Sequence, residues 1–156
     1  MANTLRFEEN WEFCFDPGDI GVQNDWPRFK PASGLKKVRV PHLFAHESNP
    51  ENAFAGFYFK EFTLDKKDPA KRFLLRVHSA HPHCRVWLNG EELGARYFGH
   101  VSFDLEATRA IKLGAVNLLT IRVQSLDKLG KIQEQSAHEL PLGAPFQKGA
   151  YAGLLG

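Results

Sequence analysis

Short segments in which apolar and polar residues alternate dominate this chain of 156 residues. Residues 72–78 and 118–124 each place an apolar side chain at every second position, which is typical of a strand with one buried face. Asn89 and Gly90 separate two further apolar segments, and Asn-Gly is the dipeptide that most readily forms a type I′ hairpin turn. The pattern therefore predicts antiparallel strands joined by short turns.

The same pattern predicts strands along most of the chain and a single helical turn over 105–109. The expected strands are residues 12–15, 36–40, 56–64, 72–78, 84–88, 91–93, 100–104 and 118–124. Within one of them, Phe57 and Phe59 have one parity whereas Phe62 and Leu64 have the other, so a β-bulge is expected near residues 60–61. Many short strands with turn signals between them predict an all-β antiparallel sandwich or jelly roll.

A series of motifs follows these strands in a distinctive order. The central ones read V-W-L-N-G at 86–90, L-G at 93–94, G-H-V-S-F-D-L at 99–105 and N-L-L-T-I-R-V at 117–123. This order resembles the N-terminal sugar-binding-type domain of glycoside hydrolase family 2, which includes β-galactosidases, β-glucuronidases and β-mannosidases. The resemblance covers nearly the whole chain, because similar motifs stand at 11–13 (W-E-F), 40–42 (V-P-H), 56–64 and 148–156.

The resemblance implies a galactose-binding-domain-like jelly roll and a particular place in a larger protein. Residues 1–156 would form a single domain, a fragment that lacks the downstream immunoglobulin-like domain and catalytic barrel. The long irregular segments 16–34 and 126–144 would then pack on the barrel and help shape the rim of its sugar pocket; the alternative is that they are plain connectors. The closing strand would begin at about Tyr151 and continue past Gly156, and a strand cut short there would lead either to self-association into a homo-oligomer or to a mobile C-terminal segment.

No catalytic residue is expected in this chain. Retaining glycosidases need an acid/base and a nucleophile about 5 Å apart, whereas the adjacent pairs 8–9 and 91–92 would point to opposite faces of a strand. In the family, both catalytic Glu residues belong to the separate barrel. The reaction, hydrolysis of a terminal β-glycoside with retention, would therefore belong to the whole enzyme, and the missing catalytic domain would be a partner of this one.

Four residues are candidates for contact with carbohydrate: Asp127, Trp26, Tyr97 and Trp87. Among β-galactosidase-like members, an Asp in the loop after this strand reaches the sugar and a bound cation, and Asp127 falls near that place with its spacing one residue different. Trp26 and Tyr97 are expected in loops, and Trp87 faces either a second apolar layer or solvent. Each aromatic residue is either a sugar-stacking surface or part of the core.

The segment 78–84 is the one place that invites a metal site, because it holds three His and Cys84, and both residue types bind zinc. The three imidazoles lie on both sides of a Pro, so they do not converge without an unusually tight turn. No cofactor is therefore expected, with a calcium or sodium ion as the alternative. Cys14 and Cys84 are expected to be buried free thiols, because one pair is too few for a disulfide scaffold.

The net charge and the N-terminal sequence restrict the expected partners and location of the protein. The chain has 20 basic and 18 acidic residues, a net charge of +2, and no basic run, which argues against nucleic acid as a partner. Residues 1–9 have no basic head and no apolar run of signal-peptide length, and no window of the sequence approaches a membrane span, so a cytoplasmic location away from membranes is expected. Three hypotheses remain: a glycosidase domain, a free-standing lectin-like carbohydrate-binding module, and a metal-dependent enzyme built on the His cluster.

Overall fold

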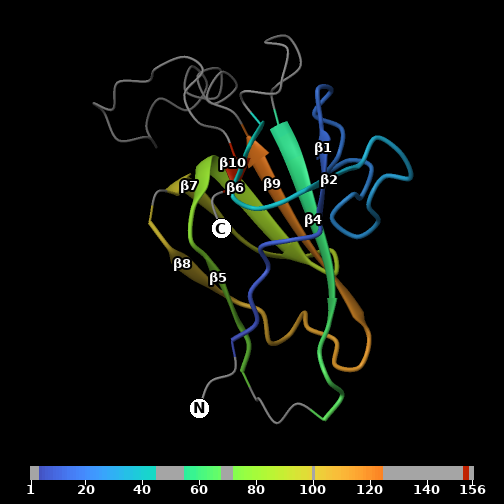
Figure 1. Ribbon diagram of the computed structural model, residues 1–156, viewed down its shortest axis with the longest axis vertical. Coiled ribbons are helices and arrows are strands. Elements are labelled where there is room, and N and C mark those ends of the chain that lie inside the picture. The colour runs from blue at the N-terminus through green and yellow to red at the C-terminus, as the bar shows by residue number, and fades with distance from the viewer. Residues whose placement is uncertain (1–3, 45–54, 68–71, 100, 125–152, 155–156) are drawn as a thin grey trace.

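The computed structural model describes residues 4–44, 55–67, 72–99, 101–124 and 153–154, and these residues form ten β-strands and no α-helix (Figure 1). None of them forms a helix of the length and apolarity that a membrane crossing needs. The predicted all-β class is confirmed. The strands are β1 (Trp11–Phe15), β2 (Lys36–Val38), β3 (His42–Leu43), β4 (Ala55–Thr63), β5 (Leu74–Val77), β6 (Ala80–Leu88), β7 (Glu91–Gly99), β8 (Phe103–Glu106), β9 (Val116–Gln124) and β10 (Gly153–Leu154).

Eight strands form one large sheet and two form a small one. The large sheet has the order β2-β1-β4-β9-β6-β10-β3, with β7 on the free edge of β6, whereas β5 pairs with β8 alone. All of these strands pair antiparallel, so the predicted antiparallel sandwich is confirmed. Strand β9 ends at Gln124 opposite His83, and β10 continues along the same edge of β6 with Gly153 opposite His81.

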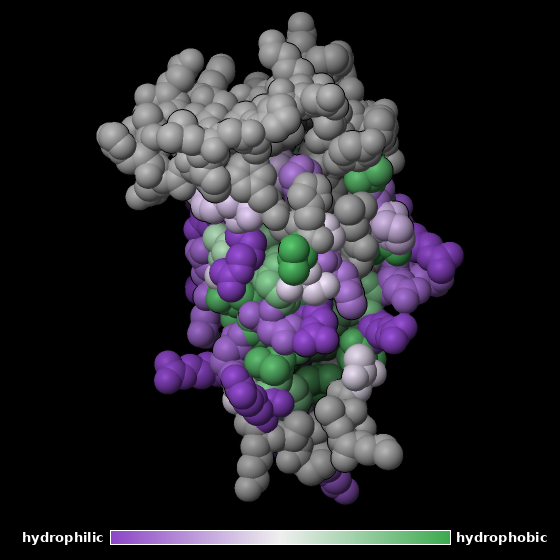
Figure 2. All heavy atoms as spheres, turned by 90° about the vertical axis from the view of Figure 1, so that its left-hand side faces the viewer, coloured by the Kyte–Doolittle hydropathy of each residue, from purple (hydrophilic) through white to green (hydrophobic). Residues whose placement is uncertain are grey.

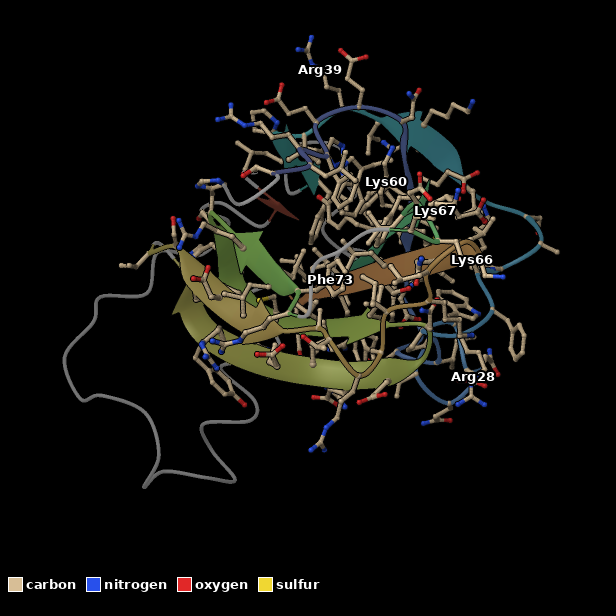
Figure 3. The ribbon with its side chains drawn as sticks, turned by 90° about the horizontal axis from the view of Figure 1, so that it is seen from below. Arg28, Arg39, Lys60, Lys66, Lys67 and Phe73 are labelled. Carbon is tan, nitrogen blue, oxygen red and sulfur yellow. The ribbon has the colours of Figure 1, made fainter. Side chains whose placement is uncertain are left out.

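The main core lies between the two sheets, because the side chains that each long strand points inward are apolar. Tyr58, Val86 and Ile121 of the large sheet are at most 2% exposed, and Val77 and Leu105 of the small sheet belong to the same cluster. Phe73 packs on this cluster and lies toward the middle of the view from below, whereas Arg28 and Arg39 extend outward at its margins (Figure 3). The hydrophobic faces therefore hold the sandwich together.

A second apolar layer covers the outer face of the large sheet. Phe57 and Phe59 of β4 point into it with Cys14 and Trp87, and Trp26 packs against them. The predicted bulge near residues 60–61 is wrong, because β4 pairs with β9 in one unbroken register over all its nine residues. Apolar residues occur at both odd and even positions of β4 because the first half of the strand is buried on both faces.

Several strand boundaries differ from the predicted ones. Strand β7 continues to Gly99, six residues beyond its predicted end, so Tyr97 lies in a strand and not in a loop. The predicted helical turn over 105–109 begins inside β8, and the chain turns only afterwards, where Ile111 N–H donates to Ala107 O at 3.0 Å. Strand β10 begins two residues after Tyr151, which is outside the described residues.

The two cysteines lie in different layers. Cys14 belongs to the outer layer and Cys84 to the main core, and both are buried free thiols, as predicted. Burial raises the pKa of Cys14 to about 12 and that of Cys84 to about 11. Both groups therefore stay protonated and act as small apolar side chains.

Candidate functional site

Residues 16–35 lie over the outer face of the large sheet. Asp16 holds the start of this segment in place. The Asp16 carboxylate is fully buried, and it accepts hydrogen bonds from the N–H groups of Ile20 at 2.9 Å and Gly21 at 3.0 Å. A Cβ on Gly21 would lie 2.5 Å from Cε3 of Trp26 and 2.6 Å from Cε2 of Phe57. Only glycine lets the segment approach the sheet this closely.

A buried arginine ties the same segment to β9. Arg122 is 5% exposed; it forms an ion pair with Asp19 through Nη2 and donates through Nη1 to Gln124 Oε1 at 3.1 Å. Its guanidinium carbon lies 6.0 Å from the centre of the Phe57 ring. The charge is therefore compensated inside the outer layer, as a buried cation requires.

Beyond this segment, the outer face of the β6–β7 hairpin carries a line of aromatic and charged side chains. Tyr97 stacks on His83 with ring centroids 4.2 Å apart and planes inclined by 26°. Arg85 pairs with Glu92 through two hydrogen bonds, Nη2 to Oε2 at 2.6 Å and Nε to Oε1 at 3.3 Å. The Arg85 guanidinium also lies 4.8 Å from the centre of the Trp87 ring.

His83 is a neutral base in this arrangement. Its side chain is 6% exposed, and burial together with the nearby Arg122 charge lowers its pKa to about 4. The imidazole therefore carries no charge at neutral pH, and it supports Tyr97 as a planar, buried surface.

The structure brings three of the four carbohydrate candidates to this outer face. Trp87 is 4% exposed and faces the second apolar layer, and Trp26 is half-buried against Phe57, whereas Tyr97 is 53% exposed. Asp127 lies outside the described residues. The Arg85–Glu92 pair could not be predicted from the sequence, because a charge on each of two strands does not reveal that the strands place the two side chains side by side.

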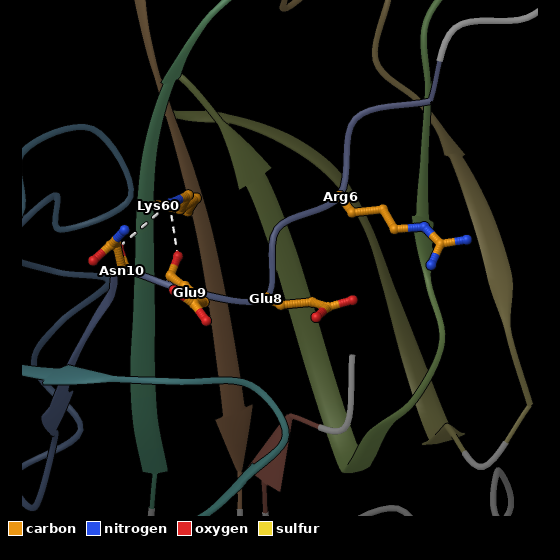
Figure 4. A pocket seen from close by; sticks show the side chains of 5 residues that line it. All are labelled: Arg6, Glu8, Glu9, Asn10 and Lys60. Carbon is orange, nitrogen blue, oxygen red and sulfur yellow. Dashed lines mark hydrogen bonds between the residues drawn. The ribbon is translucent and has the colours of Figure 1, made fainter.

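Two shallow hollows lie elsewhere on the surface. One, of about 410 Å³, is lined by Arg6, Glu8, Glu9, Asn10 and Lys60. Lys60 Nζ donates to Glu9 O at 2.8 Å and turns toward that backbone, whereas Arg6 extends away from it (Figure 4). The other, of about 560 Å³, is lined by Arg28, Phe29, Lys30, Glu61, Asn89, Lys112, Val116 and Leu118. Neither hollow brings together carboxylates from two different strands, the arrangement that a retaining glycosidase needs.

The His segment does not gather its ligand atoms. His78 Nδ1 lies 3.4 Å from Ser102 Oγ, His83 stacks on Tyr97 at the outer face, and Cys84 points into the main core. Within the part of the chain that the structure describes, no group of three or more His, Cys, Asp or Glu side chains could hold a metal ion. The described geometry therefore gives the metal-enzyme hypothesis no support.

Comparison with known proteins identifies relatives of the chain. It is 27% identical over 139 residues to the β-galactosidase BoGH2A of Bacteroides ovatus, covering 78% of this chain and 15% of that enzyme. It is 26% identical over 150 residues to the β-glucuronidase of Canis lupus familiaris, covering 88% of this chain and 22% of that enzyme. No protein-family model matches the chain.

Solved structures agree on the fold. The β-glucuronidase of Ruminococcus gnavus superimposes with a TM-score of 0.74 at 23% identity, over 99% of this chain and 28% of that one. Its complex with uronic isofagomine gives a TM-score of 0.70 at 24% identity, over 80% of this chain and 22% of that one. The chain resembles the N-terminal domain of family 2 β-galactosidases and β-glucuronidases, as its motifs predict, and it spans under a quarter of the length of these curated relatives.

Proposed function

We propose that this chain is the non-catalytic N-terminal domain of a retaining β-glycosidase, which packs on the catalytic barrel and helps shape the carbohydrate pocket. The observation that carries the proposal is that the chain matches 15% of one glycosidase and 22% of another along most of its own length. A domain of that size within a hydrolase needs no catalytic pair of its own. The missing catalytic domain of the same polypeptide is then its principal partner, and carbohydrate is the substrate of the whole enzyme.

One end of the sandwich is the proposed contact region. Ala55 begins β4, Gln124 ends β9, and the two are Cα partners, so both strands reach the same end of the sheet. Asp127 follows Gln124 by three residues, and its contact with the sugar and with a calcium or sodium ion stays a prediction. The ion pair between buried Arg122 and partly exposed Asp19 and the Asp16 hydrogen bonds fix the outer layer beside this end, and a rigid support is what a pocket-shaping domain must supply.

Hydrolysis assays on two polypeptides test the proposal. The full reading frame and the isolated 156-residue chain are each given nitrophenyl β-galactoside and nitrophenyl β-glucuronide, and the anomer released first is read by proton NMR. We expect turnover with retention from the full polypeptide and none from the isolated chain. Turnover by the isolated chain that disappears when Glu92 or another of its carboxylates is replaced would place the catalytic groups here and refute the proposal.

A second candidate function is a free-standing lectin-like carbohydrate-binding module. The observation that favours it is the exposed ring of Tyr97 on the outer face of the β6–β7 hairpin, because exposed aromatic rings are a common surface for sugars. Sugar binding by the chain, together with a stop codon after Gly156, would favour this module over the glycosidase domain.

A further inference from the structure

The turn between β6 and β7 holds a chemically reactive pair of residues. Asn89 is the one asparagine of the sequence that precedes a glycine. An asparagine side chain deamidates most readily in this dipeptide, because glycine has no side chain to shield its backbone nitrogen. The fold favours the same pair for another reason: φ is 54° at Asn89 and 84° at Gly90, as a type I′ turn requires. The turn therefore combines good geometry with a hydrolysable side chain.

Three hydrogen bonds hold the Asn89 side chain away from the reaction. Its Nδ2 donates to Ala110 O at 2.7 Å and to Asn117 Oδ1 at 2.8 Å, and its Oδ1 accepts from Leu118 N at 2.9 Å. All three partners lie in the segment 110–118, and none of these bonds involves Gly90. Deamidation needs the carboxamide carbon to reach the Gly90 nitrogen, so the side chain must first rotate out of all three bonds.

Water reaches the hairpin beside this turn. Glu91 and Glu92 follow Gly90 directly, and both are exposed. The face of the molecule that carries β5, β7 and β8 mixes hydrophilic and hydrophobic side chains and presents no single broad apolar patch (Figure 2), unlike a typical docking surface for a protein. Water, the co-reactant of deamidation, is therefore available at the turn.

We propose that Asn89 is a hydrolytic modification site that the three hydrogen bonds keep closed in the folded chain. When they open, the Gly90 nitrogen bonds to Cγ of Asn89, the Cγ–Nδ2 bond breaks, and the proton of the Gly90 N–H passes through water to Nδ2, which leaves as ammonia. Water then opens the succinimide at either carbonyl, giving aspartate or isoaspartate at position 89. The inference is independent of the proposed function.

Either product prevents the hydrogen bonds from forming again. A carboxylate oxygen in place of Nδ2 would face Ala110 O and Asn117 Oδ1, which are both acceptors. Isoaspartate would also add a methylene group to the backbone of the turn, between the Cα partners Leu88 and Glu91. Deamidation therefore separates the hairpin turn from the start of β9, and it irreversibly marks the chains that have opened at this end.

Peptide mass spectrometry after incubation of the whole chain in ¹⁸O-labelled water tests this site, because the label enters only where a side-chain amide is hydrolysed. Four samples are compared: the unmodified chain in buffer, the same chain unfolded in urea, Asn117→Ala and Gly21→Ala. Gly21→Ala is the matched control, because its new methyl group would press on Trp26 and Phe57 in the outer layer and leave the bonds of Asn89 intact. Thermal melts establish that the variants are folded during the incubation.

We expect Asn89 to deamidate about tenfold or more slowly in the folded chain than in urea, about tenfold faster in Asn117→Ala than in the unmodified chain, and less than about threefold faster in Gly21→Ala. The deamidated chain, separated by ion exchange, should melt below the intact chain. Equal rates with and without urea would overturn the proposal even if a variant does not fold. Equal acceleration in the two variants would show that global unfolding, and not the three hydrogen bonds, controls the site, and would also overturn it.

Discussion

Replacement of Asn117 by Ala is expected to destabilise the sandwich more than any surface change. Asn117 is fully buried where the chain enters β9. Its Oδ1 accepts from Lys112 N at 2.8 Å and from Asn89 Nδ2 at 2.8 Å, and its Nδ2 donates to Lys112 O at 2.8 Å and Ala115 O at 3.2 Å. One side chain thus joins the 112–115 turn to the β6–β7 hairpin turn at Asn89.

The magnitude follows from those four hydrogen bonds. Each contributes roughly 0.5 to 1.5 kcal/mol net, and the partly buried groups left behind recover some bonding to water. We therefore expect the free energy of unfolding to fall by about 3 kcal/mol, which for a chain of this size corresponds to a fall in Tm of roughly 6 to 12 °C. Asn117→Asp keeps the acceptor oxygen but replaces the amide nitrogen with a second oxygen, which would face the carbonyls of Lys112 and Ala115. This variant should therefore lower the free energy of unfolding at pH 7, and part of that loss should be recovered when the carboxyl group is protonated.

Urea unfolding followed by tryptophan fluorescence measures this change. Asn24→Ala is the matched control, because Asn24 is exposed and, among the residues that the structure describes, bonds only through its backbone N–H, to Ile20 O at 2.9 Å. That control should stay within about 0.5 kcal/mol of the unmodified chain. If Asn117→Ala also stays within that range, the network does not hold the two turns together and the reasoning is refuted.

Two further predictions concern the outer layer. Gly21→Ala should lower the free energy of unfolding by about 2 kcal/mol or more, because the new methyl group would lie 2.5 Å from Trp26 Cε3; an unchanged urea midpoint would show that the segment over the sheet moves easily to make room for the methyl group. His83 has a folded-state pKa of about 4, below its ordinary value of 6.5. As the pH falls, the unfolded chain therefore binds a proton at His83 before the folded chain does. Stability should be full above pH 6.5 and fall by roughly 3 kcal/mol toward pH 4. His83→Gln should flatten that part of the pH profile, and an equally steep profile in this variant would contradict the assignment.

The strand pattern was predictable where one face of a strand is buried and the other is not. Alternation at 118–124 gave β9, and the Asn-Gly dipeptide gave the hairpin turn, at which Asn89 and Gly90 have φ values of 54° and 84°. The prediction of a bulge in β4 was wrong because the second buried face of this strand depends on residues 16–35, which have no strand or helix periodicity. The end of β7 was missed because Gly94 and Ala95 have low β-propensity, although pairing with β6 continues past them.

The candidate site was predictable only in part. The sequence picked out Tyr97 and Trp87 as aromatic residues, but burial divides them into one exposed ring and one covered ring. His83 was read as a metal-ligand candidate, whereas the structure stacks it under Tyr97. Arg122 and Asp19 are 103 residues apart, and a contact at that separation leaves no local signal in the sequence.

The reading frame downstream of Gly156 tests the central claim most directly. Sequencing the gene should show an open frame that continues for several hundred residues and encodes a catalytic barrel with two glutamates on separate strands. A natural stop codon immediately after Gly156 would contradict the claim that this chain is one domain of a larger β-glycosidase.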